Sequence, residues 1–146
     1  MPAASLIKPN IEATKRAKQV AALTASLWKK TEAFLQEPYR LGARSWLTSA
    51  QGGVYVRKGM RFIPAFGEGV IYTFEIASVE IKESLRGQGW FKSYVRAIGH
   101  ESTTPDVLVL ESVQSPELLK HALKCWTPLP GSPNSFYITK EQASQF

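Results

Sequence analysis

The stretch VEIKESLRGQGWFKSYVRAI, residues 79–98, changes its periodicity part-way through. It begins with the alternation of a β-strand, and from Trp90 onward its apolar residues follow the spacing of an α-helix. Arg86, Gly87 and Gly89 lie where the pattern changes. The sequence therefore predicts a strand that ends in a glycine-containing turn and leads directly into a helix.

A turn of this kind is suited to binding an anion. The first amides of a helix have no intrahelical partner, and the helix dipole adds positive charge at the same place, where phosphate is the usual ligand. Glycine lets the backbone approach the oxygen atoms without a Cβ in the way. Arg86 and Lys82 add positive charge nearby. A purely structural glycine corner is the alternative interpretation of these residues taken alone.

Composition limits the class of protein. The 146 residues, 44% of them hydrophobic, fit one domain, residues 1–146, with a substantial core. No apolar run approaches the roughly 20 residues of a membrane span, and the first residues lack a secretory pattern, so we expect a cytoplasmic protein. A single cysteine, Cys125, and two histidines predict neither a disulfide nor a metal site. The net charge of +6 favours an anionic partner, whether a nucleic acid, an acidic protein or a phosphorylated cofactor.

The remaining sequence predicts an α/β (α+β) fold with a mixed sheet. A short strand at residues 4–8 is followed by a helix from the N-cap Asn10 to Gln36, with a break near Thr24. Later strands are predicted at residues 43–49, 54–56, 61–65, 70–81, 106–113 and 134–139, with a hairpin turn at 57–60. Helices are predicted at residues 89–99 and 116–124, the second capped by Ser115.

The run LRGQGWFKSYVRAI after a long strand resembles the acetyl-CoA motif of the GNAT (N-acetyltransferase) superfamily. In that family an Arg/Gln-x-x-Gly-x-Gly/Ala loop binds the cofactor pyrophosphate at the start of a helix. Arg86 and Gly89 match its first and central positions, and Gly87 matches a frequent additional glycine. The resemblance covers roughly residues 54–139, and the compact layout is also similar to short GNAT-like proteins of bacterial viruses.

This resemblance implies a single GNAT-like domain with a mostly antiparallel central sheet flanked by helices. It implies an acetyl-CoA-dependent N-acetyltransferase whose acceptor is an amine, with an amine on a protein among the candidates. The residues that it implies for cofactor binding are the strand edge and the following corner, together with a residue at the next helix start: Val79, Glu80, Ile81, Arg86, Gly87, Gln88, Gly89, Trp90 and Ser115.

Two side chains are candidates for proton transfer. Glu75 interrupts an apolar strand, and strict alternation places it on one face with Ala77, Val79 and Ile81. Apolar neighbours could raise its pKa and make it a base, and the alternative is an ion pair with Arg57 or Arg61 of a neighbouring strand. His121 stands where the family commonly has a tyrosine that acts as the general acid. A histidine at this position could protonate the departing thiolate at neutral pH. The alternative for His121 is a solvent-facing helix residue.

Departures from the family motif support a second hypothesis. Phe91 replaces a small residue, Ser115 an asparagine, and Cys125-Trp126 a Gly-Phe pair. These changes fit a catalytically degenerate GNAT-shaped protein of viral origin that binds an acidic protein complex in the host cytoplasm. Nucleic acid is disfavoured as the partner, because the aromatic and basic residues of VYVRKGMRF lack the ribonucleoprotein pattern.

Overall fold

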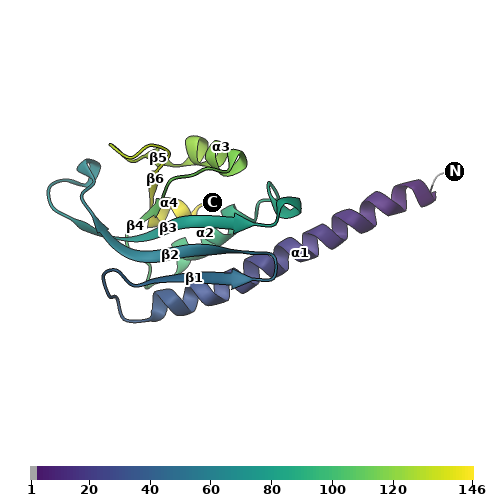
Figure 1. Cartoon of the computed structure of the whole chain (residues 1–146), viewed down its shortest axis with the longest axis horizontal. Helices are drawn as coiled ribbons and strands as arrows, with labels where there is room; N and C mark the ends of the chain where they lie inside the picture. The colour runs from purple at the N-terminus through teal and green to yellow at the C-terminus, as the bar shows by residue number, and fades with distance from the viewer. Residues whose placement is uncertain (1–2) are drawn as a thin grey trace.

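The computed structural model describes residues 3–146, which form four α-helices and one six-stranded sheet (Figure 1). The helices are α1 (Ala3–Gln36), α2 (Trp90–His100), α3 (Pro116–Cys125) and α4 (Lys140–Ser144). The strands are β1 (Arg44–Ser49), β2 (Gly52–Arg61), β3 (Ile71–Ile81), β4 (Val107–Leu110), β5 (Thr127–Pro128) and β6 (Phe136–Thr139). None of the helices in this described part of the chain has the length and apolarity that crossing a membrane requires.

The sheet is mixed, with the strand order β1-β2-β3-β4-β6-β5. Four of its neighbouring pairs are antiparallel, and β3 with β4 is the parallel pair. A parallel pair needs a crossover connection, which here contains α2. The predicted α/β fold with a mostly antiparallel sheet flanked by helices is therefore confirmed.

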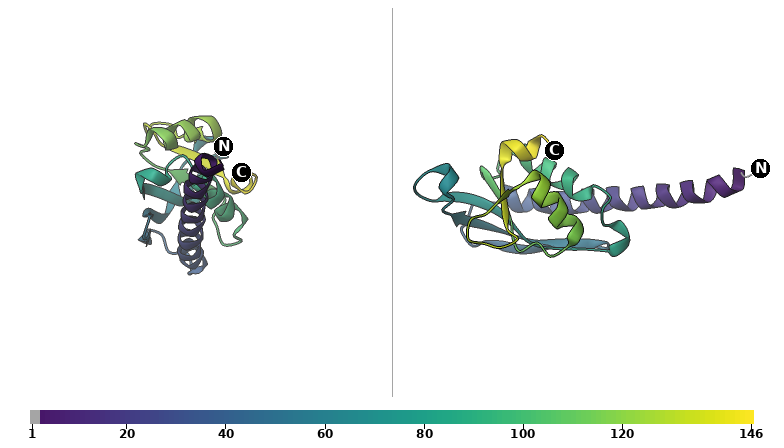
Figure 2. Two further views of the ribbon diagram at one scale, coloured as in Figure 1. Left: turned by 90° about the vertical axis from the view of Figure 1, so that its right-hand side faces the viewer. Right: turned by 90° about the horizontal axis from the view of Figure 1, so that it is seen from above.

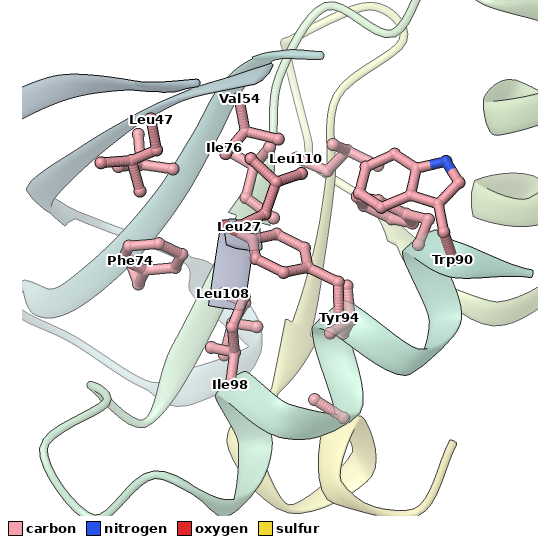
Figure 3. Close-up of a cluster of buried hydrophobic side chains, with 14 of the residues drawn as sticks. Leu27, Leu47, Val54, Phe74, Ile76, Trp90, Tyr94, Ile98, Leu108 and Leu110 are labelled. Atoms are coloured by element: carbon pink, nitrogen blue, oxygen red, sulfur yellow. The ribbon is translucent and has the colours of Figure 1, made fainter. Parts of the chain in front are cut away.

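The main core lies between the sheet and the helices α1 and α2 (Figure 3). It is built from side chains on one face of the strands, such as Phe74, Ile76 and Leu108, which are fully buried. A hydrogen bond inside this core joins the two helices: the Tyr94 hydroxyl lies 2.7 Å from Thr31 Oγ1, which in turn donates to the carbonyl oxygen of Leu27. Tyr94 is therefore the donor in this pair, and the bond fixes α2 against α1.

The opposite face of the sheet, called the outer face below, carries a second and smaller apolar cluster. Val107 and Val109 alternate with the core residues of β4 and pack with Ile63 and Leu129 from two connecting segments. The rest of the outer face over β1 to β3 is more open, and Trp46 lies there against Tyr55 with ring centroids 5.2 Å apart.

A β-bulge in β3 changes which side chains face the core. Ile76 pairs with Val56, and Ser78 pairs with the preceding residue of β2, so Ala77 is an extra residue in β3. Val79 and Ile81 consequently pack with the main core, although strict alternation placed them on the face of Glu75. That prediction was wrong because an extra residue reverses the alternation beyond it.

Several predicted boundaries also need correction. The backbone of residues 4–8 is helical, and α1 continues through Asn10 and Thr24 without a strand, a cap or a break. Figures 1 and 2 show that its N-terminal half projects beyond the body of the molecule.

The predicted turn at residues 57–60 lies inside the continuous strand β2, and the hairpin turn is at residues 50–51. The basic residues that suggested a turn have partners across the structure. Arg57 pairs with Glu75, and the buried Lys58 donates from Nζ to the carbonyl oxygen of Glu37 at 3.1 Å, just beyond the end of α1. Gly59 is required by a close approach, since a Cβ there would lie 2.6 Å from Glu75 Oε2.

Candidate functional site

A pocket of about 470 Å³ lies at the corner between the end of β3, the start of α2 and the start of α3. Its walls come from segments that are distant in sequence, with Val79 and Ile81 on one side and Gln114 to Leu118 on another. The pocket gathers eight of the residues predicted for the site: Val79, Ile81, Arg86, Gly87, Gly89, Trp90, Ser115 and His121. Glu75, Glu80 and Gln88 are not part of its lining.

The backbone at this corner presents unpaired amides. Gly87 has φ of 71° and Gly89 has φ of 81°, a left-handed conformation that favours glycine. Within the described residues, the amides of residues 87–89 donate to no acceptor, and no side chain caps α2. The first three amides of α2 are also free, because the first bond of the helix runs from Ser93 N to Gly89 O. The positive end of α2 is therefore available to an anion.

Two cations flank these amides. Arg86 is exposed, and its Nε donates to the carbonyl oxygen of Ile81 at 3.1 Å, which fixes the guanidinium beside the corner. Lys92, in the first turn of α2, also lines the pocket. One carboxylate, Glu117, lines the opposite wall, where a backbone hydrogen bond, the Ser115 hydroxyl and the charge of Arg86 lower its pKa.

Ser115 caps the N-terminus of α3, a structural role beyond the cofactor-binding role that the resemblance implied. Its Oγ accepts from Leu118 N at 3.4 Å and donates to Glu117 Oε2 at 2.9 Å. The predicted N-cap of α3 is therefore confirmed, and the hydroxyl is already engaged in holding that helix.

Phe91 does not block the corner. It is 6% exposed, and its ring stacks on Trp126 with a centroid distance of 6.4 Å and packs edge-on against His121. The side chain that replaces the small residue of the family motif therefore belongs to the core and forms part of the pocket wall.

A second, smaller cavity of about 280 Å³ continues from this pocket into the sheet. It lies where β3 and β4 part, because their pairing ends at Ile76 and Leu110 and β3 continues for five more residues. The two cavities share four lining residues: Val79, Gln114, Ser115 and Leu118. Glu80 lines this gap, which leads from the corner toward Glu111.

His121 is held as a neutral imidazole. Trp126 Nε1 donates to its Nε2 at 3.2 Å, so the proton of the neutral ring is on Nδ1. Burial and the charge of Lys92 lower its pKa. With a lowered pKa, the ring is mostly neutral at neutral pH. Its Nδ1–H can then donate a hydrogen bond to a ligand.

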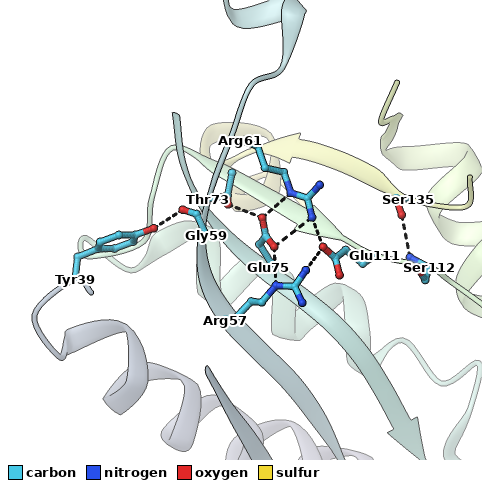
Figure 4. Close-up of polar contacts among 9 residues, drawn as sticks. All are labelled: Tyr39, Arg57, Gly59, Arg61, Thr73, Glu75, Glu111, Ser112 and Ser135. Atoms are coloured by element: carbon cyan, nitrogen blue, oxygen red, sulfur yellow. Dashed lines mark hydrogen bonds and ion pairs between the residues drawn. The ribbon is translucent and has the colours of Figure 1, made fainter. Parts of the chain in front are cut away.

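Glu75 lies on the outer face in a cluster of four charges (Figure 4). Its side chain is 3% exposed and accepts from Arg57 Nε at 2.9 Å, from Arg61 Nε at 2.6 Å and from Thr73 Oγ1 at 2.7 Å. Both arginines also pair with Glu111. Burial disfavours the charged carboxylate, but the hydrogen bonds from Arg61, Thr73 and Arg57 outweigh it and lower the pKa. The suggested rise in pKa was wrong, and the ion-pair alternative describes the geometry.

Sequence reasoning missed several residues that line the two cavities, among them the polar residues Lys92, Glu111, Gln114 and Glu117. Lys92 had a signal, because a basic residue two positions after Trp90 falls in the first turn of the predicted helix. The described residues contain no cluster of three or more histidine, cysteine or acidic side chains that could hold a metal ion.

Comparisons with known proteins bear on the fold. No protein-family profile matches the chain, and no curated protein sequence matches it significantly. A variant of the AtaT toxin bound to the C-terminus of the antitoxin AtaR aligns over 65% of this chain and 62% of the matched chain, with a TM-score of 0.50 and 19% identity. The same complex with acetyl-CoA aligns over the same shares, with a TM-score of 0.50 and 17% identity.

A KacTA–DNA complex aligns over 80% of this chain and 83% of the matched chain, with a TM-score of 0.51 and 12% identity. The alignment with AtaT spans less than two thirds of that chain's length. At these identities the likeness is one of fold, and it confirms the GNAT-like architecture. These matches concern toxins and a DNA complex, and they give no support to the predicted similarity to viral proteins.

Proposed function

We propose that this chain is an acetyl-CoA-dependent N-acetyltransferase that binds its cofactor at the corner between β3 and α2. The observation that carries the proposal is the set of unpaired amides at residues 87–92 beside Arg86 and Lys92. Such an arrangement suits a diphosphate, because the amides donate hydrogen bonds and the helix dipole and the cations supply positive charge. The solved AtaT structure that contains acetyl-CoA supports the choice of cofactor.

The other residues of the pocket are assigned by position. The unpaired edge of β3 at residues 79–81 would hold the pantetheine arm in the gap between β3 and β4. His121 would donate a hydrogen bond from Nδ1, because its Nε2 is already occupied by Trp126. Acetyl-CoA, when bound, supplies the activated acetyl group. Glu75 has both oxygens in ion pairs, so we assign it to holding Arg57 and Arg61 in place.

Calorimetric titration with acetyl-CoA tests the cofactor part of the proposal. We expect a micromolar dissociation constant for the wild type and no measurable binding for Arg86→Glu, which replaces a cation by an anion at the corner. The matched control is Arg40→Glu, an exposed arginine in the segment between α1 and β1, where the same charge reversal should leave the affinity unchanged. Absence of binding to the wild type, or equal loss in both variants, contradicts the proposal.

A second candidate function is a GNAT-shaped binding protein without turnover. It is favoured by one observation: His121 replaces the family's tyrosine and is held neutral by Trp126. The AtaT structures with a segment of the antitoxin AtaR support a protein partner for a chain of this fold. Incubation with acetyl-labelled acetyl-CoA and a bacterial extract separates the two, since an enzyme transfers the label to a component of the extract. A chain that binds the cofactor and transfers no label is the binding protein.

A further inference from the structure

The end of β4 places a carboxylate in the gap between β3 and β4. The backbone N–H of Glu111 donates to the carbonyl oxygen of Ile76 at 3.0 Å, which is the last bond linking the two segments. Glu111 is two residues beyond Val109 and shares its side of the sheet, the outer face. Its side chain is 16% exposed and lines the gap together with Ser78. The carboxylate therefore stands where the cavity from the corner meets the outer face.

The hydrogen bonds of this carboxylate are made by one oxygen (Figure 4). The Nη2 groups of Arg57 and Arg61 both donate to Glu111 Oε1. Among the side chains of residues 11–146 and the described backbone, no hydrogen bond reaches Oε2 of Glu111. Glu75 differs, since Arg57 and Thr73 contact opposite oxygens of its carboxylate. Of the two acids in the cluster, Glu111 is the one with an oxygen available to a further ligand.

The backbone beside Glu111 turns sharply away from β3. Ser112 has φ of 45°, a left-handed conformation that costs a non-glycine residue about 1 kcal/mol. Its amide donates to Oγ of the buried Ser135 at 3.0 Å, which holds the turn. Strained backbone of this kind persists where the surrounding structure fixes it, and it is common next to functional sites. The turn directly follows Glu111, where β4 has ended and its pairing with β3 has stopped.

We propose that Glu111 Oε2 receives the amino group of the acyl acceptor, which approaches from the outer face while the cofactor lies on the side of the corner. This inference rests on the proposed function and names its acceptor-binding residue. A carboxylate oxygen accepts an N–H hydrogen bond from a primary amine whether or not the amine is protonated. The neutral amine is the nucleophile that acyl transfer needs, and the same oxygen accepts from the amine before and after it loses its extra proton.

Two thioethers of coenzyme A test the inference without knowledge of the natural acceptor. S-(2-aminoethyl)-coenzyme A carries a primary amine close to the sulfur atom, and S-propyl-coenzyme A has the same shape with a methyl group in its place. Calorimetry at pH 7 should find the amine probe about tenfold tighter on the wild type, the value expected for one charge-assisted hydrogen bond that is partly exposed. In Glu111→Gln we expect the two probes to bind equally.

Glu68→Gln is the matched control, because Glu68 is an exposed carboxylate in the segment between β2 and β3 that lines neither cavity. It should keep the preference for the amine probe, and coenzyme A itself should bind the wild type and both variants equally, which also verifies folding. Equal binding of the two probes to the wild type, a preference that survives in Glu111→Gln, or a preference lost in Glu68→Gln each overturns the role of Glu111. Failure of the wild type to bind coenzyme A overturns the proposed function as well, so the two failures are distinguishable.

Discussion

Replacing Glu75 by glutamine should destabilise the fold in a pH-dependent way. The carboxylate is 3% exposed and accepts four hydrogen bonds, one from Arg57, two from Arg61 and one from Thr73. Breaking a fully buried ion pair costs about 3–5 kcal/mol. Arg57 and Arg61 are 34% and 27% exposed and keep Glu111 as a partner, so water and the second acid compensate part of the loss. We therefore expect Glu75→Gln to lower the free energy of unfolding by about 2 kcal/mol at pH 7.

The pH dependence follows from the lowered pKa of Glu75. A carboxyl group with a lower pKa in the folded state stabilises the fold above its unfolded pKa, near 4.3, and loses that contribution as the pH falls through its folded value. The difference in stability between the wild type and Glu75→Gln should therefore be complete at pH 7 and shrink steadily below about pH 4.

Urea denaturation at a series of pH values, followed by the fluorescence of the four tryptophans, measures both quantities. Glu80→Gln serves as the control, because an exposed carboxylate should change stability by no more than about 0.5 kcal/mol. A loss as small as this in Glu75→Gln, or a difference that stays constant into acid, would refute the stabilising role of the four-charge cluster.

Three further predictions concern the helix α2 and its surroundings. Gly89→Ala should lower the free energy of unfolding by about 1 kcal/mol, because Gly89 has a left-handed φ. The same substitution should weaken acetyl-CoA binding in calorimetry. Unchanged affinity would show that this backbone does not approach the cofactor. Tyr94→Phe removes the buried hydrogen bond to Thr31 and should lower the free energy of unfolding by about 1 kcal/mol in urea denaturation, whereas no loss would mean that this bond contributes nothing. An NMR titration of His121 should give a midpoint below the ordinary pKa of 6.5, and Lys92→Gln should raise that midpoint. A midpoint at or above 6.5 in the wild type contradicts the buried, neutral state.

Features encoded within a short stretch could be predicted from the sequence. The strand-to-helix corner was recognisable because glycines with left-handed φ, an apolar helical stripe and a preceding strand all lie within residues 79–98. The cap of α3 was recognisable for the same reason, since Ser115 and Pro116 are adjacent. Such signals depend only on residues that are close together in the chain, so they can be identified without knowledge of the tertiary fold.

Features that depend on pairing between strands could not be predicted. The bulge at Ala77 arises from the register of β2 against β3, and no pattern within β3 alone reveals an extra residue. Gly59 was interpreted as part of a turn because its real constraint, the nearby carboxylate of Glu75, comes from another strand. The pKa of Glu75 was misjudged for the same reason, because its arginine partners lie on β2.

The candidate site shows the same division. The corner residues were predicted together because they are contiguous, and the pocket gathers them with His121 from a later helix. Glu111 was missed because its position depends on where β4 parts from β3, which is a property of the sheet.

Amide hydrogen exchange with and without saturating coenzyme A tests the central claim most directly. The unpaired amides at residues 87–92 have no acceptor in the described protein, so they should exchange rapidly in the free chain. We predict that coenzyme A slows their exchange at least about tenfold, and that it leaves residues 31–36 unchanged, at the end of α1 that lies beside the C-terminal end of α2. Tight binding that leaves residues 87–92 unprotected would contradict a diphosphate site at this corner.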